Sequence, residues 1–264
     1  MLIKPKKSLG QNFLHDENII NKIVNASKIS SDDQVLEVGP GTGNLTKLII
    51  SQKPKKIYVI EKDSNLVLLL KKNFKNQIEI LNNDVLKVNE NLLSKEKLVV
   101  FGNLPYNIST EILCKWILNF NDKKFWFSNL ILMFQKEVAE RIISKFNTSS
   151  YGRLSILANW RLEINKICDV KPISFSPKPK VDSSLLFLKP KKKFLNFDNP
   201  KNLEEITRIF FNHRRKMIKK PFNQIFNGNK NVLNKLKIDL NLRPQNLDVE
   251  MYYQLTSEYE KLIC

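Results

Sequence analysis

The residues that most suggest chemistry are an Asn-Leu-Pro-Tyr tetrapeptide that begins at Asn103 and follows the apolar run 98–101. Such a run is typical of a buried strand in a parallel sheet, and open α/β sheets bind ligands at the carboxyl ends of their strands. The Asn103 side-chain oxygen and a backbone carbonyl beside the rigid Pro105 can accept two hydrogen bonds, and Tyr106 can stack on a ring. The tetrapeptide therefore suits an amino group on a flat ring, with its lone pair aimed at an electrophile. The alternative is a plain proline turn.

A glycine-rich turn lies between a predicted strand, residues 34–38, and a predicted helix. Glycines in this position allow the backbone to approach a ligand closely at the helix N-terminus. The spacing Gly39-x-Gly41-x-Gly43 is shorter than the GxGxxG pattern of dinucleotide folds,. The shorter pattern favours an adenosyl ligand without a pyrophosphate, although an ordinary strand-to-helix turn would look the same.

Acidic residues close the next two predicted strands. Glu61 follows the strand 56–60, about 20 residues after the glycine turn, where an acidic side chain holds the two ribose hydroxyls of a nucleoside,. Asp84 follows the strand 78–81, where a carboxylate can accept a hydrogen bond from an adenine amino group,. Either acid alone would be an ordinary exposed strand end. Together with Asn103 they are expected to surround one pocket.

The predicted strands alternate with helical segments, which indicates βαβ units and a parallel sheet. Five parallel strands are expected, at residues 34–38, 56–60, 78–81, 98–101 and 129–134, and two further strands at 162–170 and 183–188. The expected fold class is therefore α/β, with a seven-stranded, mostly parallel sheet.

The two ends of the chain are predicted to differ. Lys4–Gln11 is expected to be a basic arm without secondary structure, and Asp16 to cap a helix,. After the basic break 189–193, apolar residues at helical spacing predict helices near 203–217, 232–236 and 251–263,. The simplest organisation is a ligand-binding domain, 1–190, followed by a small helical domain, 191–264.

Charge and cysteine content limit the class of protein. The 264 residues have a net charge of +18, which favours nucleic acid over membrane as a partner, although a lysine-rich compositional bias would give the same charge,. No apolar run approaches the roughly 20 residues of a membrane span, and no secretory signal is predicted. The three cysteines are widely spaced, so we expect reduced thiols, no metal site and a cytoplasmic protein.

These residues together resemble S-adenosylmethionine-dependent methyltransferases of the ribosomal RNA adenine dimethyltransferase family, which implies a Rossmann-like class I methyltransferase fold. The resemblance covers nearly the whole chain. Its most specific motifs are Gly10–Leu14 and Phe101–Thr110, and the others are 37–43, 135–138, 151–155, 175–183 and 214–216. The chain is most similar to the bacterial branch of the family, which dimethylates two adjacent adenosines in the 3′-terminal hairpin of 16S rRNA.

The resemblance implies a role for each matching residue. The target N6 would be held by Asn103 and the Leu104 carbonyl, beside Pro105, and the flipped base would lie between Tyr106 and Phe175. Glu61 would bind the ribose of S-adenosylmethionine and Asp84 its adenine; the other residues expected around that cofactor are Asn12, Leu14, Gly39, Gly41 and Asn103. The residues expected to contact RNA are Lys6, Lys7, Arg214, Arg215 and Lys216. No metal is expected.

The implied partner is 16S rRNA in the small ribosomal subunit or its precursor, bound by a monomer. Two alternatives stay open. One is the related class that methylates a large-subunit rRNA adenine and confers macrolide resistance; the stretch 175–183 and the Arg-Arg-Lys run are less similar to that class. The other is a non-catalytic assembly factor that binds RNA or DNA. The intact set Glu61, Asp84 and Asn103 speaks against it.

Overall fold

The computed structural model describes residues 4–118 and 125–263. The chain forms two compact units. Of the described residues, the first comprises 4–113, 125–139 and 163–190, and the second comprises 114–118, 140–162 and 191–263. These units differ from the predicted domains 1–190 and 191–264, because 114–118 and 140–162 belong to the same unit as the C-terminal helices. The division into a ligand domain and an RNA domain stays a prediction.

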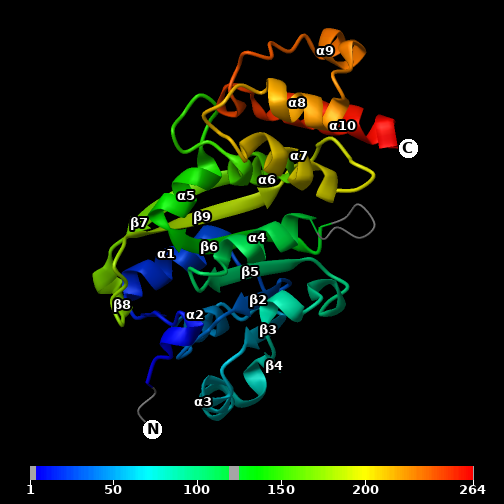
Figure 1. Ribbon diagram of the computed structural model, residues 1–264. Coiled ribbons are helices and arrows are strands. Elements are labelled where there is room, and N and C mark those ends of the chain that lie inside the picture. The colour runs from blue at the N-terminus through cyan, green and yellow to red at the C-terminus, as the bar shows by residue number, and fades with distance from the viewer. Residues whose placement is uncertain (1–3, 119–124, 264) are drawn as a thin grey trace. The chain divides into compact units, whose positions relative to one another are not determined.

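The first unit is built on a seven-stranded sheet in the order β4-β3-β2-β5-β6-β9-β7 (Figure 1). The strands β4, β3, β2, β5 and β6 are parallel, and β9 is antiparallel to β6. Their bounds are β2 Gln34–Val38, β3 Lys56–Glu61, β4 Glu79–Asn82, β5 Leu98–Asn103, β6 Phe127–Gln135, β7 Leu162–Val170 and β9 Ser183–Pro190. The predicted α/β fold with a seven-stranded, mostly parallel sheet is confirmed.

Burial explains why the central strands are almost wholly apolar. Side chains on both faces of a parallel sheet are covered, and β2, β3, β5 and β6 contribute buried residues such as Val35, Val59 and Val100 to the core. The strand β5 runs two residues further than predicted, so Gly102 and Asn103 still belong to it. Asn103 is therefore held by the sheet and does not lie in a free loop.

Two helices of the first unit begin where local capping chemistry predicts. Asp16 caps α1 (Glu17–Ser27) by accepting hydrogen bonds from the backbone N–H groups of Asn18 and Ile19, as predicted,. Asp63 caps α3 (Ser64–Phe74) in the same way. The glycine turn precedes α2 (Asn44–Ser51). Two further helices, α4 (Ser109–Leu118) and α5 (Lys136–Ile143), begin in the first unit and end in the second.

The N-terminal arm is not structureless, contrary to the prediction. Lys7–Leu9 forms a 3-10 helix, and the short strand β1 (Phe13–Leu14) pairs antiparallel with β8 (Phe175–Ser176). The side chain of Lys6 forms an ion pair of 2.7 Å with Asp63, to which Gln11 Nε2 also donates a hydrogen bond of 3.0 Å. These partners are more than 50 residues away along the chain, which is why local composition did not indicate them.

The second unit is helical. Its helices are α6 (Arg153–Arg161), α7 (Lys201–Phe211), α8 (Lys219–Phe226), α9 (Lys230–Leu236) and α10 (Val249–Ile263). The helix α7 packs against α6, α8 and α10. The prediction that Met217 continues the face of α7 is wrong: the helix ends at Phe211, a turn follows, and Met217 is exposed. The helix α8 was not predicted. Its third residue is Pro221, and proline is tolerated in a first helical turn,.

Candidate functional site

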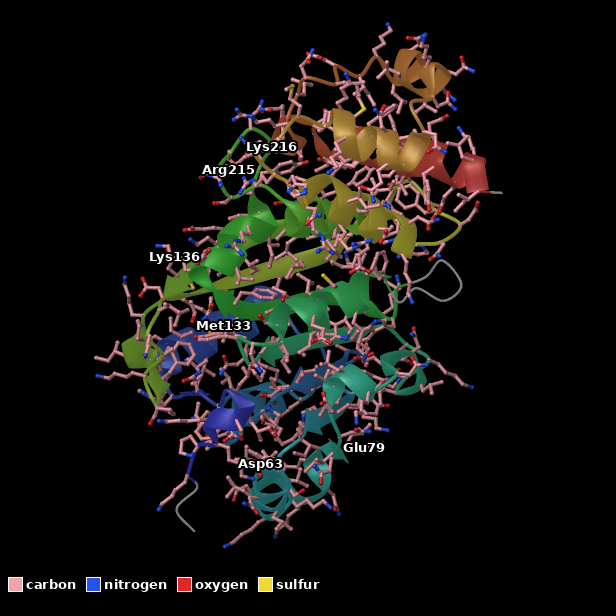
Figure 2. All side chains as sticks on the ribbon, in the orientation of Figure 1. Asp63, Glu79, Met133, Lys136, Arg215 and Lys216 are labelled. Atoms are coloured by element: carbon pink, nitrogen blue, oxygen red, sulfur yellow. The ribbon has the colours of Figure 1, made fainter. Side chains whose placement is uncertain are left out.

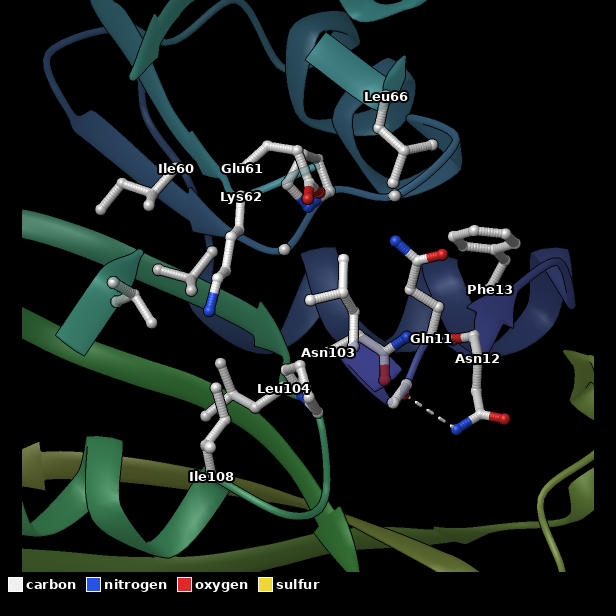
Figure 3. Close-up of a pocket in the computed structure, with 18 of the residues that line it drawn as sticks. Gln11, Asn12, Phe13, Ile60, Glu61, Lys62, Leu66, Asn103, Leu104 and Ile108 are labelled. Atoms are coloured by element: carbon white, nitrogen blue, oxygen red, sulfur yellow. Dashed lines mark hydrogen bonds between the residues drawn. The ribbon is translucent and has the colours of Figure 1, made fainter. Parts of the chain in front are cut away.

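A pocket of the first unit lies at the carboxyl ends of β2, β3 and β5 (Figure 3). The chain passes from β2 to β3 on one side and later returns to β5 on the other, so β2 marks the switch point at which α/β sheets bind ligands,. The predicted residues that line the pocket are Asn12, Leu14, Gly39, Gly41, Glu61, Asp84, Asn103, Leu104, Pro105 and Tyr106.

The glycine turn lines the pocket in a backbone conformation that favours glycine. Gly41 has a φ of 59°, and a Cβ built on it would lie 2.8 Å from Cδ1 of Phe13. The turn is fixed to the sheet by a hydrogen bond of 3.0 Å from the Gly39 N–H to the carbonyl of Ile60. A side chain at Gly41 would fill space between the turn and β1, so the turn is a preformed cradle that suits a closely approaching ligand.

Gly41→Ala is therefore expected to weaken binding of the predicted cofactor, S-adenosylmethionine, by roughly tenfold or more, through positive-φ strain and displacement of Phe13,. Isothermal titration calorimetry measures the change. Gly152→Ala is the matched control, because Gly152 has an extended φ of −173° and the nearest atom to an added Cβ is 3.9 Å away. Equal affinities for the Gly41→Ala variant and the unaltered protein would contradict the assigned role of the turn.

Glu61 ends β3 with its carboxylate buried against backbone N–H groups. It is 7% exposed, and Oε1 accepts a hydrogen bond of 2.8 Å from the Asp63 N–H. Burial raises the pKa of Glu61 above its ordinary value, and backbone hydrogen bonds from Asp63, Gly41 and Lys62 oppose that shift,. The same carboxylate thus joins the end of β3 to the glycine turn and lines the pocket.

Asp84 lies at the pocket edge and is already engaged. Lys62 Nζ donates to Oδ2 at 2.8 Å, and the Leu86 N–H donates to Oδ1 at 3.0 Å. The hydrogen bond from Lys62 is the main reason that the pKa of Asp84 lies below its ordinary value. The carboxylate is therefore ionised at neutral pH and keeps lone pairs for a further donor.

The Asn103 side chain has a defined orientation. Its Nδ2 donates a hydrogen bond of 2.9 Å to the backbone carbonyl of Asn12, so Oδ1 is the atom left to accept a hydrogen bond from a ligand. Asn12 thus acts on Asn103 through its main chain, a contact between residues 91 positions apart that the sequence did not indicate. Figure 3 shows both residues beside the pocket.

Tyr106 lines the pocket and is tied to the sheet. Its hydroxyl shares a hydrogen bond of 2.6 Å with the hydroxyl of Ser183, the first residue of β9. Burial raises the pKa of Tyr106, so the phenol stays protonated. The ring can therefore offer a fixed apolar face to a flat ligand.

Phe175 does not reach this pocket. Its side chain is 1% exposed and packs in the core, because β8 pairs with β1 and places Phe175 opposite Leu14. Phe175 is not among the residues that line the pocket, and its stacking on a base stays a prediction. The sequence predicted a proline-rich loop beginning at Phe175 and did not indicate that this residue belongs to a strand.

Glu37 was not predicted as a site residue, although a carboxylate in an otherwise apolar strand is unusual and can indicate a functional role. It is 1% exposed, lines the pocket, and its Oε2 accepts a hydrogen bond of 2.6 Å from Thr46 Oγ1. Burial raises the pKa of Glu37 to about 8, against the effect of the Thr46 hydrogen bond. The acid is therefore mostly protonated at neutral pH.

Glu37→Gln should remove a pH-dependent loss of stability. At a pH below the ordinary pKa of glutamate, Glu37 is protonated in both the folded and the unfolded state. Between that pKa and about pH 8, Glu37 ionises in the unfolded chain but stays protonated in the folded protein,. Wild-type stability should therefore fall as pH rises to about 8, by a few kcal/mol at most, at about 1.4 kcal/mol per pH unit. Urea unfolding of both proteins from pH 5 to pH 9 measures the difference. The free energy of unfolding of Glu37→Gln relative to wild type should grow with pH. The control Glu79→Gln, at the exposed end of β4, should show the same pH dependence of stability as wild type.

The residues expected to contact RNA fall into two groups. Lys6 is paired with Asp63, and Lys7 is exposed in the 3-10 helix. In the second unit Arg215 and Lys216 are exposed in a turn, whereas Arg214 is half-buried and donates a hydrogen bond of 3.1 Å to the carbonyl of Thr148. Lys6 and Arg214 thus already have partners in the protein.

Within 4–118 and 125–263, no cluster of three or more His, Cys, Asp or Glu residues could hold a metal ion. Across these same ranges no helix is both long enough and apolar enough to span a bilayer. Cys168 is a free thiol.

The fold defines a class of protein. The structure superposes on a dimethyladenosine transferase from Plasmodium falciparum with a TM-score of 0.80 and 32% identity, over 94% of this chain and 98% of that one. It superposes on the 23S rRNA methyltransferase ErmE with a TM-score of 0.68 and 23% identity, over 93% of this chain and 98% of that one, a likeness of fold alone. The fold is that of the Rossmann-like methyltransferases.

The sequence gives the family. The family described as ribosomal RNA adenine dimethylase matches residues 3–261, and the chain belongs to it. It is 61% identical over 262 residues to ribosomal RNA small subunit methyltransferase A of Pelagibacter ubique, covering 99% of each chain. It is 40% identical over 262 residues to the protein of the same name from Ehrlichia ruminantium, covering 97% of each. The predicted resemblance is confirmed.

Proposed function

We propose that the protein transfers methyl groups from S-adenosylmethionine to N6 of two adjacent adenosines in the 3′-terminal hairpin of 16S rRNA. The observation that carries the proposal is that Asn103, Glu61 and Asp84 line one pocket at one edge of the sheet, where the Asn12 carbonyl orients the Asn103 amide. The small-subunit names of relatives at 61% and 40% identity support the choice of rRNA. A small-subunit substrate would place the reaction in the cytoplasm.

The pocket fits an adenosyl cofactor by its own chemistry. Gly41 leaves room for a ligand against the backbone, Glu61 offers a buried acceptor for ribose hydroxyls, and Asp84 an ionised acceptor for an amino group. S-adenosylmethionine, when bound, supplies an electrophilic methyl group on a sulfonium. Asn12 and Leu14 line the same pocket from the N-terminal segment, and the contacts of Asp63 with Lys6 and Gln11 hold that segment in place.

The remaining task of the chain is to position the target amine. Asn103 Oδ1 and the Leu104 carbonyl accept its N–H groups and direct the nitrogen lone pair, while Tyr106 stacks on the base. These acceptors strengthen as the nitrogen gains positive charge, so they stabilise the transition state more than the ground state. The methylated amine is acidic, so its proton passes to water without a dedicated base.

Tritiated methyl transfer tests this proposal. Small subunits that lack the modification should accept methyl groups, and mass spectrometry should find two adjacent dimethyladenosines in 16S rRNA. Incorporation into 23S rRNA instead would support the large-subunit alternative. Tight RNA binding without any incorporation would support a non-catalytic assembly factor.

A further inference from the structure

The loop between α5 and α6, residues 144–152, exposes an aromatic ring. Phe146 is 48% exposed and adjoins Lys145, which is also exposed. No other phenylalanine among the described residues is exposed to this degree. Single exposed apolar side chains are common on protein surfaces, so the ring alone does not indicate a binding site. The residues around the ring provide that evidence.

Three contacts within the second unit fix this loop. The N–H of Asn147, which has a φ of 64°, donates to the carbonyl of Gln245 at 2.9 Å. The side chain of Asn246 donates to Asn147 Oδ1 at 2.8 Å, and Arg214 donates to the carbonyl of Thr148 at 3.1 Å. The loop is thus preorganised, and it holds Phe146 in the solvent at little further entropic cost on binding.

The contact from Arg214 also joins the loop to the basic turn 213–216, which is closed by a hydrogen bond of 2.9 Å from the Lys216 N–H to the His213 carbonyl. Figure 2 shows Arg215 and Lys216 beside the loop. The sequence has no acidic residue in 141–162 or in 206–238. Outside these two stretches, Asp248 acts electrostatically on Tyr151 at the end of the loop. A ring in a loop that is tied to a basic turn suits a polyanion that also carries flat faces.

We propose that Phe146 is a stacking platform for an unpaired base of the RNA substrate, with Arg215 and Lys216 holding the adjoining phosphates. The inference rests on the proposed rRNA substrate and adds a contact outside the methyl-transfer pocket. Single-stranded RNA is bound in this manner, by aromatic faces for bases and cations for the backbone. Arg214 is then a positioning residue, since its guanidinium holds the loop.

Phe146→Trp gives a direct optical test. The natural tryptophans Trp116, Trp126 and Trp160 are all buried, so the new indole would be the exposed one. Stacking by a base should quench its fluorescence when a single-stranded oligoadenylate is added. Heparin, a polyanion without bases, should bind the cations and leave the indole emission unchanged. Equal quenching by both, or by neither while RNA binds, would overturn the proposal.

Affinity provides the second test. Phe146→Ala should weaken binding of oligoadenylate by roughly tenfold or more, and Phe146→Tyr should restore it, as expected for base stacking. Met217→Ala is the matched control, because Met217 is 56% exposed near the same basic turn and has no aromatic face. Equal losses for Phe146→Ala and Met217→Ala would indicate a general apolar contact, such as a protein-binding surface, and would refute stacking.

Methyl transfer separates this inference from the proposed function. Phe146 lies outside the pocket, so Phe146→Ala should bind S-adenosylmethionine normally and raise KM for small subunits more than it lowers kcat. If wild type methylates small subunits and Phe146→Ala does so with unchanged KM, the stacking role fails alone. If wild type does not methylate them, the proposed function fails.

Discussion

Asn103→Ala is expected to lower the rate of methyl transfer by about a hundredfold to a thousandfold, the loss typical of removing one preorganised polar contact to a developing charge. The physical reason is that Asn103 Oδ1 is the side-chain acceptor at the end of β5 whose orientation the Asn12 carbonyl fixes. Single-turnover methylation of unmodified small subunits measures the rate. The affinity for S-adenosylmethionine should change comparatively little.

Two measurements keep this result interpretable. Asn21→Ala, on the exposed side of α1, removes an asparagine whose side chain donates to the carbonyl of Glu17, and it should leave the rate unchanged. Calorimetry should show cofactor binding by Asn103→Ala within a few fold of wild type. A parallel loss of cofactor affinity and rate would mean that Asn103 builds the pocket and does not steer the amine.

Glu61→Ala is expected to weaken binding of S-adenosylmethionine by roughly a hundredfold or more, since hydrogen bonds to a charged acceptor contribute about 1.5–3 kcal/mol each. The variant also leaves the Asp63 N–H without its acceptor and loosens the end of β3. Calorimetric titration measures the loss, and Glu61→Gln should recover part of it because an amide keeps one acceptor oxygen. Glu79→Ala, an exposed acid on β4, should bind the cofactor like wild type.

The pH dependence gives the Glu61 assignment a second check. Burial raises the pKa of Glu61, so the ionised acceptor is lost at a higher pH than for an ordinary glutamate. Cofactor affinity of wild type should therefore decline as pH falls towards that raised pKa, and Glu61→Gln should not show this decline. If the cofactor affinity of Glu61→Gln declines at low pH as that of wild type does, the titrating group is another residue, such as Asp84.

The residues at strand ends were predictable from the sequence. Apolar runs place the parallel strands, and the carboxyl ends of parallel strands meet at one edge of the sheet. Gly39, Gly41, Glu61, Asp84 and Asn103 could therefore be assigned to one pocket before any coordinates. The caps formed by Asp16 and Asp63 were predictable for a similar reason, because a capping side chain bonds to backbone two or three residues away,.

Tertiary structure alone decided the contacts between distant segments. The orientation of Asn103 depends on Asn12, the burial of Phe175 on the pairing of β8 with β1, and the fixed arm on Asp63. The packing of 140–162 with the C-terminal helices also depends on contacts between distant segments. Periodicity and spacing report only on neighbours along the chain, whereas these contacts form when the folded sheet brings remote residues within hydrogen-bonding distance.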